Sequence, residues 1–184
     1  MSNLIDGLTI VKDFITVDEE QKLLKIIENL EWNGSLLRKS RHFGYIYNYK
    51  TKTIGKDDYI GNLPEWIKPY INRIYKKGYI DKYPDQITIN RYLPGEGIAA
   101  HIDVPEVFAE KLYSISIGSG CNIDFQNKTE YHSYYIYPRT FMLMENSARY
   151  EYTHCIKRYK SDIVENQKID RDTPYSIPFR NVIL

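Results

Sequence analysis

The sequence has only two cysteines, Cys121 and Cys155, among its 184 residues. Two cysteines cannot build the disulfide framework of a small secreted protein, so a reduced cytoplasmic or nuclear environment is expected. The first twenty residues carry three aspartates and no long apolar core, which is unlike a secretory signal peptide. No apolar run reaches the length that spans a bilayer, so neither secretion nor membrane insertion is expected.

An excess of charge of either sign is also missing, because 25 basic residues stand against 24 acidic ones for a net charge of +1. Any contact with nucleic acid must therefore come from a local patch rather than from an overall positive field. Residues 33–56 form such a patch, since they contain no acidic residue. Its basic and aromatic side chains are Arg38, Lys39, Arg41, His42, Phe43, Tyr45, Tyr47, Tyr49, Lys50, Lys52 and Lys56.

Two interpretations of residues 33–56 remain open. Basic side chains neutralise phosphates and aromatic rings stack on exposed bases, which favours a nucleotide-binding surface. Alternatively, the segment is a hairpin in which Tyr45, Tyr47 and Tyr49 alternate into the core while the lysines are solvated. The two interpretations are compatible with each other.

Two helices are predicted in the first half of the chain. The hydroxyl of Thr16 and the carboxylate of Glu19 have the spacing of a capping box, so a helix should begin there and end at the turn at 33–34. A second helix should begin near Pro64 and end at Gly78, since its apolar residues recur at helical spacing.

After the second helix the pattern changes to short alternating runs, which predict strands. The predicted strands are 86–92, 98–103, 112–118, 122–126, 134–138, 140–144, 152–156 and 175–180. Two helices followed by about eight strands predict an α+β fold, a double-stranded β-helix (jelly roll) with the helices packed on one sheet. With 42% hydrophobic and 27% charged residues, residues 1–184 are expected to form a single domain.

Two histidines and one aspartate are candidate metal ligands. Asp103 follows His101 by two positions, so on an extended strand both side chains leave by the same face. His154 lies on a later predicted strand, which a barrel can bring across to them. Two imidazoles and a carboxylate bind iron(II) on one side and leave other coordination positions open. Alone, a His and an Asp two apart are more often a solvated pair than a metal site.

The residues around this triad carry further motifs. Asn90 and Tyr92 are separated by one residue, a turn at Gly95 follows, and Arg180 comes after Ser176 near the end of the sequence. With the triad, this order resembles the AlkB family of iron(II)- and 2-oxoglutarate-dependent dioxygenases. Matches at residues 41–45, 84–90, 114–119, 124–125, 138–139 and 147–154 resemble the branch that is elsewhere fused to a tRNA wobble-uridine methyltransferase.

The resemblance implies that the triad binds iron(II) as the catalytic centre. It also implies that Asn90 and Tyr92 hydrogen-bond 2-oxoglutarate and that Arg180 binds one of its carboxylates. One position departs from the family pattern, because Pro174 stands where a second arginine usually pairs with the far carboxylate. Either Arg171 replaces that arginine, or the affinity for 2-oxoglutarate is low, or catalysis has been lost.

The resemblance further implies a nucleic-acid substrate. Pro105 stands where base-repair members often carry another acidic residue, which favours hydroxylation of a modified wobble uridine in tRNA. Two alternatives remain: demethylation of alkylated bases in DNA or RNA, and a catalytically silent module that binds RNA or protein. The expected partner is tRNA, bound by a monomer, with an accessory protein replacing the RNA-recognition and methyltransferase modules of that branch.

Other residues have less definite predictions. Nothing in the sequence places His42 or His132 near the metal, so both are expected to be structural. Arg149 either supports the metal ligands or forms an ordinary salt bridge. Residues 157–174 are predicted to be a long charged loop that covers the site, because they directly follow the last ligand.

Overall fold

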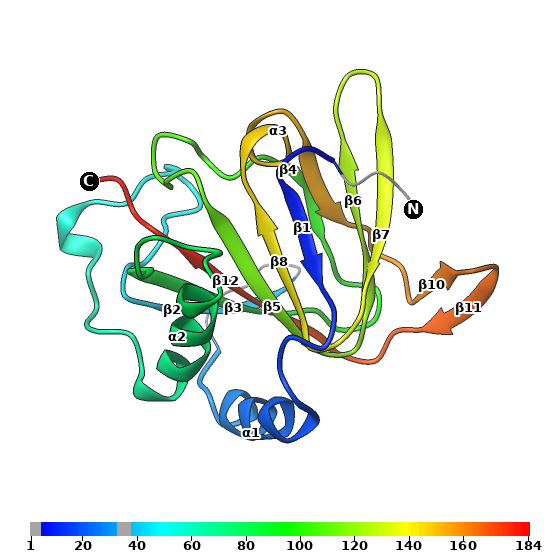
Figure 1. Cartoon of the computed structure of the whole chain (residues 1–184), viewed down its shortest axis with the longest axis horizontal. Helices are drawn as coiled ribbons and strands as arrows, with labels where there is room; N and C mark the ends of the chain where they lie inside the picture. Colours follow the sequence, from blue (N-terminus) through cyan, green and yellow to red (C-terminus); the bar gives the residue numbers. More distant parts are fainter. Residues whose placement is uncertain (1–4, 33–37) are drawn as a thin grey trace.

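The computed structural model describes residues 5–32 and 38–184, and its core is a pair of antiparallel sheets (Figure 1). The larger sheet has the strand order β1-β8-β5-β12-β3-β2. These strands are β1 (Leu8–Val11), β8 (Thr140–Met144), β5 (Leu112–Gly118), β12 (Pro174–Arg180), β3 (Gln86–Arg91) and β2 (Lys39–Phe43). Neighbours in this order are far apart in sequence, so the sheet is held together by long-range pairing.

The smaller sheet has four strands in the order β4-β9-β6-β7. Its strands are β4 (Ile98–His101), β9 (Thr153–Ile156), β6 (Cys121–Gln126) and β7 (Tyr131–Ile136). It packs against the inner face of the larger sheet, where Met142 and Met144 of β8 share a buried cluster with Phe125 and Ile156. The two sheets therefore enclose the space in which a site can be built.

Two helices cover the outer face of the larger sheet (Figure 1). They are α1 (Val17–Glu28) and α2 (Lys68–Lys76), and their apolar sides share a buried cluster with Phe141 and Leu143 of β8. Alternate residues of β8 thus face the helices and the opposite sheet, as the period of two in a strand requires. The predicted α+β jelly roll with helices packed on one sheet is confirmed.

The helix boundaries follow local signals. Thr16 accepts a hydrogen bond from the Glu19 amide (3.2 Å), and Glu19 accepts one from the Thr16 amide (2.8 Å), so the predicted capping box is present. The first helix ends at Glu28, earlier than predicted, and residues 33–34 of the predicted stop lie outside the described residues. The remaining helical elements are η1 (Lys56–Asp58), η2 (Glu65–Ile67) and α3 (Asn146–Tyr150).

All eight predicted strands occur, and the described residues form four further strands that were not predicted. Two of these are the edge strands β1 and β2 of the larger sheet. The other two, β10 (Ser161–Val164) and β11 (Gln167–Asp170), form a hairpin at the right of Figure 1. The prediction that 157–174 is a loop is therefore wrong. The hairpin turn uses Glu165 and Asn166 at positive φ (49° and 65°), a tight turn without the glycine that usually marks it.

The strand that carries the first candidate ligand is irregular. The register of β4 against β9 runs from Ile98 opposite Ile156 to His101 opposite His154, so β4 contains one extra residue. Such a bulge re-aims the side chains that follow it. The strand ends at His101, and Asp103 lies beyond it, contrary to the prediction that both belong to one strand over 98–103.

A glycine permits the close approach of the chain entering β4 to β9. A Cβ atom at Gly97 would lie 2.1 Å from the Ile156 carbonyl oxygen, a distance that no larger residue can accept without moving backbone. Across the described part of the chain, every helix is too short or too polar to span a bilayer.

Candidate active site

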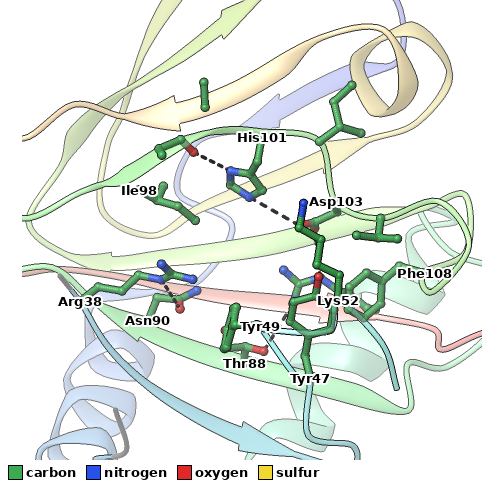
Figure 2. A pocket seen from close by; sticks show the side chains of 15 residues that line it. Arg38, Tyr47, Tyr49, Lys52, Thr88, Asn90, Ile98, His101, Asp103 and Phe108 are labelled. Carbon is green, nitrogen blue, oxygen red and sulfur yellow. Dashed lines mark hydrogen bonds and ion pairs between the residues drawn. The ribbon is translucent and has the colours of Figure 1, made fainter. Parts of the chain in front are cut away.

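The two candidate histidines stand directly opposite each other on neighbouring antiparallel strands, β4 and β9. The centroids of the His101 and His154 rings are 4.4 Å apart. Asp103 approaches from the segment after β4, with Oδ1 3.6 Å from His101 Nε2. One ligand atom from each of the three residues lies within 4.8 Å of the other two. The structure thus brings the predicted triad together, and His101 points towards Asp103 in Figure 2.

The protonation states of these side chains suit a metal ion. His101 Nδ1 lies 2.8 Å from the Ala99 carbonyl, which can only accept, so Nδ1 donates and Nε2 is the nitrogen that faces Asp103. Burial lowers the pKa of His154 to about 3, so this imidazole is neutral at pH 7. Burial opposes the charge of Asp103, but Arg180, His101 and His154 together outweigh it and hold the pKa of that carboxyl well below its usual range. Two neutral imidazoles and a carboxylate fit iron(II).

Arg180, the last residue of β12, orients the carboxylate of the triad. Its Nε donates to Asp103 Oδ2 (3.1 Å), and its Nη1 donates to Gln86 Oε1 (3.3 Å) and Thr88 Oγ1 (3.4 Å). The guanidinium lies 4.8 Å from the centroid of the Phe108 ring. These contacts fix the guanidinium beside Asp103.

Arg149 supports the segment that carries Asp103. Its Nη1 donates to the Asp103 carbonyl (2.6 Å) and its Nη2 donates to the Phe108 carbonyl (3.1 Å), while the side chain is buried. Burial lowers the pKa of this guanidinium. Of the two roles predicted for Arg149, support of the metal ligands agrees with these contacts, because both acceptors are backbone carbonyls.

A small cavity of about 70 Å³ lies between the sheets next to the triad. Asn90 and Tyr92 line it from the side of β3, and Arg180 lines it from β12. Tyr92 is only 3% exposed, and burial raises the pKa of its hydroxyl, which therefore stays a hydrogen-bond donor. The structure brings Asn90, Tyr92 and Arg180 to the triad, as the sequence predicted.

A wider cavity of about 290 Å³ opens beside the triad (Figure 2). His101 and Asp103 line one side, and basic and aromatic residues of the 33–56 segment line the other. These residues are Arg38, Tyr47, Tyr49 and Lys52. Tyr45 and Tyr47 also pack against the buried cluster between the sheets, whereas Tyr49 is 37% exposed. The predicted packing into the core therefore holds for two of the three tyrosines, and residues 33–37 lie outside the described residues. Nucleotide binding by this segment stays a prediction.

Arg171 does not reach either cavity. Its Nε and Nη2 donate to the two carboxylate oxygens of Asp162 (2.5 and 2.6 Å), and Nη1 donates to the Lys157 carbonyl (2.7 Å). The side chains of this pair are 2% and 1% exposed. The expectation that Arg171 replaces the arginine missing at Pro174 is therefore not met. The expectation that 157–174 covers the site fails too, since the residues lining both cavities come from other segments.

The sequence reading missed a polar row that supports Arg180. Gln86 and Thr88 precede Asn90 at alternate positions of β3, and all three are buried on the same face. Thr88 Oγ1 also lies 3.1 Å from His42 Nδ1. Polar residues at every second position of an otherwise apolar strand were the available signal. His132, as expected, lies elsewhere, stacked on Tyr134.

His42 makes the stability of the protein depend on pH. Burial, with the nearby charges of Arg180, Arg38 and Arg41, lowers the pKa of His42 to about 4 in the folded state, against 6.5 for an ordinary histidine. Between these values the unfolded chain binds a proton that the folded protein does not, so stability falls as pH falls.

We expect His42 to contribute a loss of about 1–2 kcal/mol in unfolding free energy between pH 7 and pH 5. Urea titrations at a series of pH values measure this, with His42→Gln as the comparison. In the variant, the slope of unfolding free energy against pH should be smaller by up to one proton. An unchanged slope would contradict the assignment of this effect to His42.

Comparison with known proteins identifies the class. Residues 17–180 match the model of the 2OG-Fe(II) oxygenase superfamily. Uncharacterized protein L905 of Acanthamoeba polyphaga mimivirus is 36% identical over 97% of this chain and 86% of its own length. The tRNA (carboxymethyluridine(34)-5-O)-methyltransferase ALKBH8 of Mus musculus is 37% identical over 86% of this chain. The Alkylated DNA repair protein ALKBH8 homolog of Arabidopsis thaliana is 30% identical over 92% of this chain.

The chain spans 25% of the mouse relative and 56% of the Arabidopsis relative. Among solved structures, OsALKBH1 superposes with a TM-score of 0.72 at 14% identity, covering 98% of this chain and 99% of the other. A Pseudomonas putida prolyl-4-hydroxylase superposes with a TM-score of 0.61 at 10% identity, covering 95% and 92%. At these identities the structural matches establish the fold alone.

The fold and the family match define an iron(II)- and 2-oxoglutarate-dependent dioxygenase, and the triad has the donor set that this iron needs. Within that superfamily the chain belongs to the AlkB family. The cofactors are therefore Fe(II) and 2-oxoglutarate.

Proposed function

We propose that this enzyme hydroxylates a modified wobble uridine in tRNA. The observation that carries the proposal is the 290 Å³ cavity, in which His101 and Asp103 face cationic and aromatic side chains. An aromatic ring can stack on a base while a cation neutralises a phosphate, so the cavity suits a single exposed nucleotide. The 37% identity to a protein named as a tRNA wobble-uridine enzyme supports this substrate over others.

We assign the metal to His101, Asp103 and His154, and 2-oxoglutarate to the small cavity lined by Asn90 and Tyr92. When bound, these cofactors supply the oxidising power: the keto acid becomes succinate and CO₂ while one oxygen atom of O₂ enters the substrate. The protein positions the reactants and excludes water. Tyr92 and Asn90 offer hydrogen bonds to the keto acid, and Arg180 offers a guanidinium that is already fixed by Asp103.

Residues 1–184 would form a single domain that acts as a monomer in the cytoplasm or the nucleus, with tRNA as its partner. A net charge of +1 provides no long-range attraction to RNA, so local contacts must supply the affinity. For the same reason, we propose that an accessory protein helps to position the tRNA.

Tyr49 is the residue through which we expect the outer cavity to contact RNA. Its ring lines the cavity and is 37% exposed. Because loss of a base-stacking ring costs about 1–3 kcal/mol, Tyr49→Ala should weaken tRNA binding by roughly 5- to 100-fold. Fluorescence anisotropy with labelled tRNA measures this.

Tyr75 on α2 provides the matched control for Tyr49, since it is 45% exposed on a helix of the outer face. Tyr75→Ala should leave the tRNA affinity unchanged. Equal losses in both variants would show that the outer cavity is not the RNA-binding surface.

The proposed reaction is tested by incubating the protein with tRNA, Fe(II) and 2-oxoglutarate and then digesting the tRNA to nucleosides. Mass spectrometry should find a modified uridine that has gained one oxygen atom, and the His101→Ala variant should produce none. A parallel assay uses oligonucleotides that carry N6-methyladenine, because a relative of Caenorhabditis elegans named DNA N6-methyl adenine demethylase is 27% identical.

Three results are distinguishable in these assays. Oxygen added to the uridine supports the proposal. Formaldehyde released from methylated oligonucleotides, with unaltered tRNA, would replace it by demethylation. RNA binding without any succinate production would indicate a silent binding module.

A further inference from the structure

A dicarboxylate in the small cavity requires a second cation. 2-Oxoglutarate carries a carboxylate at each end, and only the end next to the keto group can bind the metal. The other carboxylate would enter a buried space, where an unpaired charge is costly. Arg180 is already engaged by Asp103, and Pro174, the β12 residue beside Tyr92, has no charge.

We propose that Arg38 binds this far carboxylate, from the opposite side of β3. The inference rests on the proposed placement of 2-oxoglutarate beside Asn90 and Tyr92. It assigns to Arg38 a role in cosubstrate selection, for which Arg171 was one of the alternatives from the sequence.

The register of the larger sheet places Arg38 level with Pro174. β3 lies between β12 and β2, and Tyr175 and Lys39 are both paired with Arg91. One step further along, Pro174 and Arg38 therefore flank Tyr92 from its two sides. The Tyr92 amide donates to the Pro174 carbonyl (3.0 Å), which fixes one of these neighbours.

The faces also agree. Alternate residues of a strand face the same side, so Arg38 shares a side with Ser40, which pairs with Asn90. Neighbouring strands are about 4.8 Å apart, so position 38 is about two strand spacings from position 174. An arginine side chain is long enough to cover much of that distance.

The contacts of Arg38 direct it to the same place. Its Nε donates to Asn90 Oδ1 (3.2 Å), and its guanidinium lies 5.4 Å from the centroid of the Tyr49 ring. Figure 2 shows Arg38 and Asn90 side by side, across the cavity from His101. The positive charge of Arg38 lowers the pKa of the Tyr92 hydroxyl, although burial raises this pKa by more. We assign the bidentate Nη1 and Nη2 edge to the carboxylate.

Other cations near β3 are placed less suitably. Arg91 faces the opposite side of the strand, where its guanidinium lies 5.2 Å from the Trp32 ring. Arg171 is paired with Asp162. Lys52, like Arg38, lines the outer cavity and not the small one. Arg38 differs in donating to Asn90, which lines both cavities, so Lys52 serves as a matched control.

The test compares two keto acids. 2-Oxovalerate has the chain length of 2-oxoglutarate but ends in a methyl group, so it cannot use a far-end cation. Titration calorimetry with the Mn(II)-loaded full chain, without oxygen, gives Kd for both ligands and does not depend on turnover. Arg38→Ala should weaken 2-oxoglutarate binding by about 10- to 100-fold, the usual cost of losing a charged hydrogen-bond pair. Its affinity for 2-oxovalerate should change less than about twofold, within the scatter of a neutral substitution.

Two further variants make the test specific. Lys52→Ala should retain the wild-type preference for 2-oxoglutarate. This result would show that the weaker binding in Arg38→Ala is not a general effect of removing positive charge. In the Arg38→Ala background, Pro174→Arg should restore at least part of that preference, since it returns a guanidinium to the other side of Tyr92.

The contrary outcomes are distinct. Equal weakening of both ligands by Arg38→Ala, or an equal effect of Lys52→Ala, would overturn the assignment. So would unchanged 2-oxoglutarate binding with a loss of tRNA affinity, which would place Arg38 in the RNA-binding surface. If Asn90→Ala and Tyr92→Phe also left 2-oxoglutarate binding unchanged, the proposed placement of 2-oxoglutarate would be the assumption at fault.

Discussion

Replacing His101 by alanine is expected to abolish metal binding and succinate production while leaving the protein folded. The imidazole supplies one of three ligands, and the two that remain cannot enclose the ion. We expect metal affinity to fall by more than about 100-fold, since even partners of the ligands cost 10- to 100-fold. The side chain is 31% exposed and lies at the end of a short strand, so unfolding free energy should change by less than about 1 kcal/mol.

Calorimetry with Mn(II), succinate assays and urea unfolding measure these three quantities. His132→Ala is the control, because His132 is 32% exposed on β7, at the other edge of the same sheet, but is not part of the triad. Metal binding should survive in the control. Residual Mn(II) affinity and succinate production in His101→Ala would show that the triad has been assigned wrongly.

Replacing Arg171 by alanine is expected to destabilise the protein by about 3–5 kcal/mol, the cost of leaving a buried charge without its partner. Asp162 is 1% exposed on β10, and its carboxylate would remain in the interior. Because Arg171 lines neither cavity, the folded fraction should bind 2-oxoglutarate with unchanged affinity. Urea unfolding and calorimetry at low temperature separate the two effects.

The double variant Asp162→Leu with Arg171→Met provides the control. Removing both charges leaves no unpaired ion, so most of the lost stability should return. The recovery would be incomplete, because Asp162 also accepts from the Asn122 amide and Arg171 donates to the Lys157 carbonyl. A stability close to wild type in the single variant would mean that the pair contributes little.

The two arginines near the end of the sequence have different tasks. Arg180 acts in the site, where it fixes Asp103, whereas Arg171 stabilises a hairpin outside it. In the sequence both stand close to Pro174, and either could have bound a carboxylate. Only the fold of residues 157–173 separates them.

Local signals succeeded where the relevant physics is local. The capping box at Thr16 and Glu19 needs only a spacing of three residues, and it is present. The apolar run at 141–144 marks β8, which is buried on both of its faces. Short-range geometry of this kind can be read directly from the chain.

Other elements depended on partners distant in sequence. The basic strand β2 has no strong pattern of its own and exists because it pairs with β3. The hairpin β10–β11 turns at Glu165 and Asn166. This pair does not predict a tight turn, whereas an Asn-Gly pair would. Asp103 was predicted to lie on a strand, but β4 contains a bulge and ends at His101, so Asp103 lies in the loop that follows.

The sequence by itself determined the chemistry that is possible: two imidazoles and a carboxylate for iron(II), and alternating apolar runs for a jelly roll. These follow from residue identity and from spacings of a few positions. The tertiary structure decided which charges lie beside that chemistry, placing Arg180 and Arg38 at the cavities and Arg171 away from them. The physical reason is strand register, which is fixed by hydrogen bonds between segments far apart in the chain and by the burial of one face of each strand.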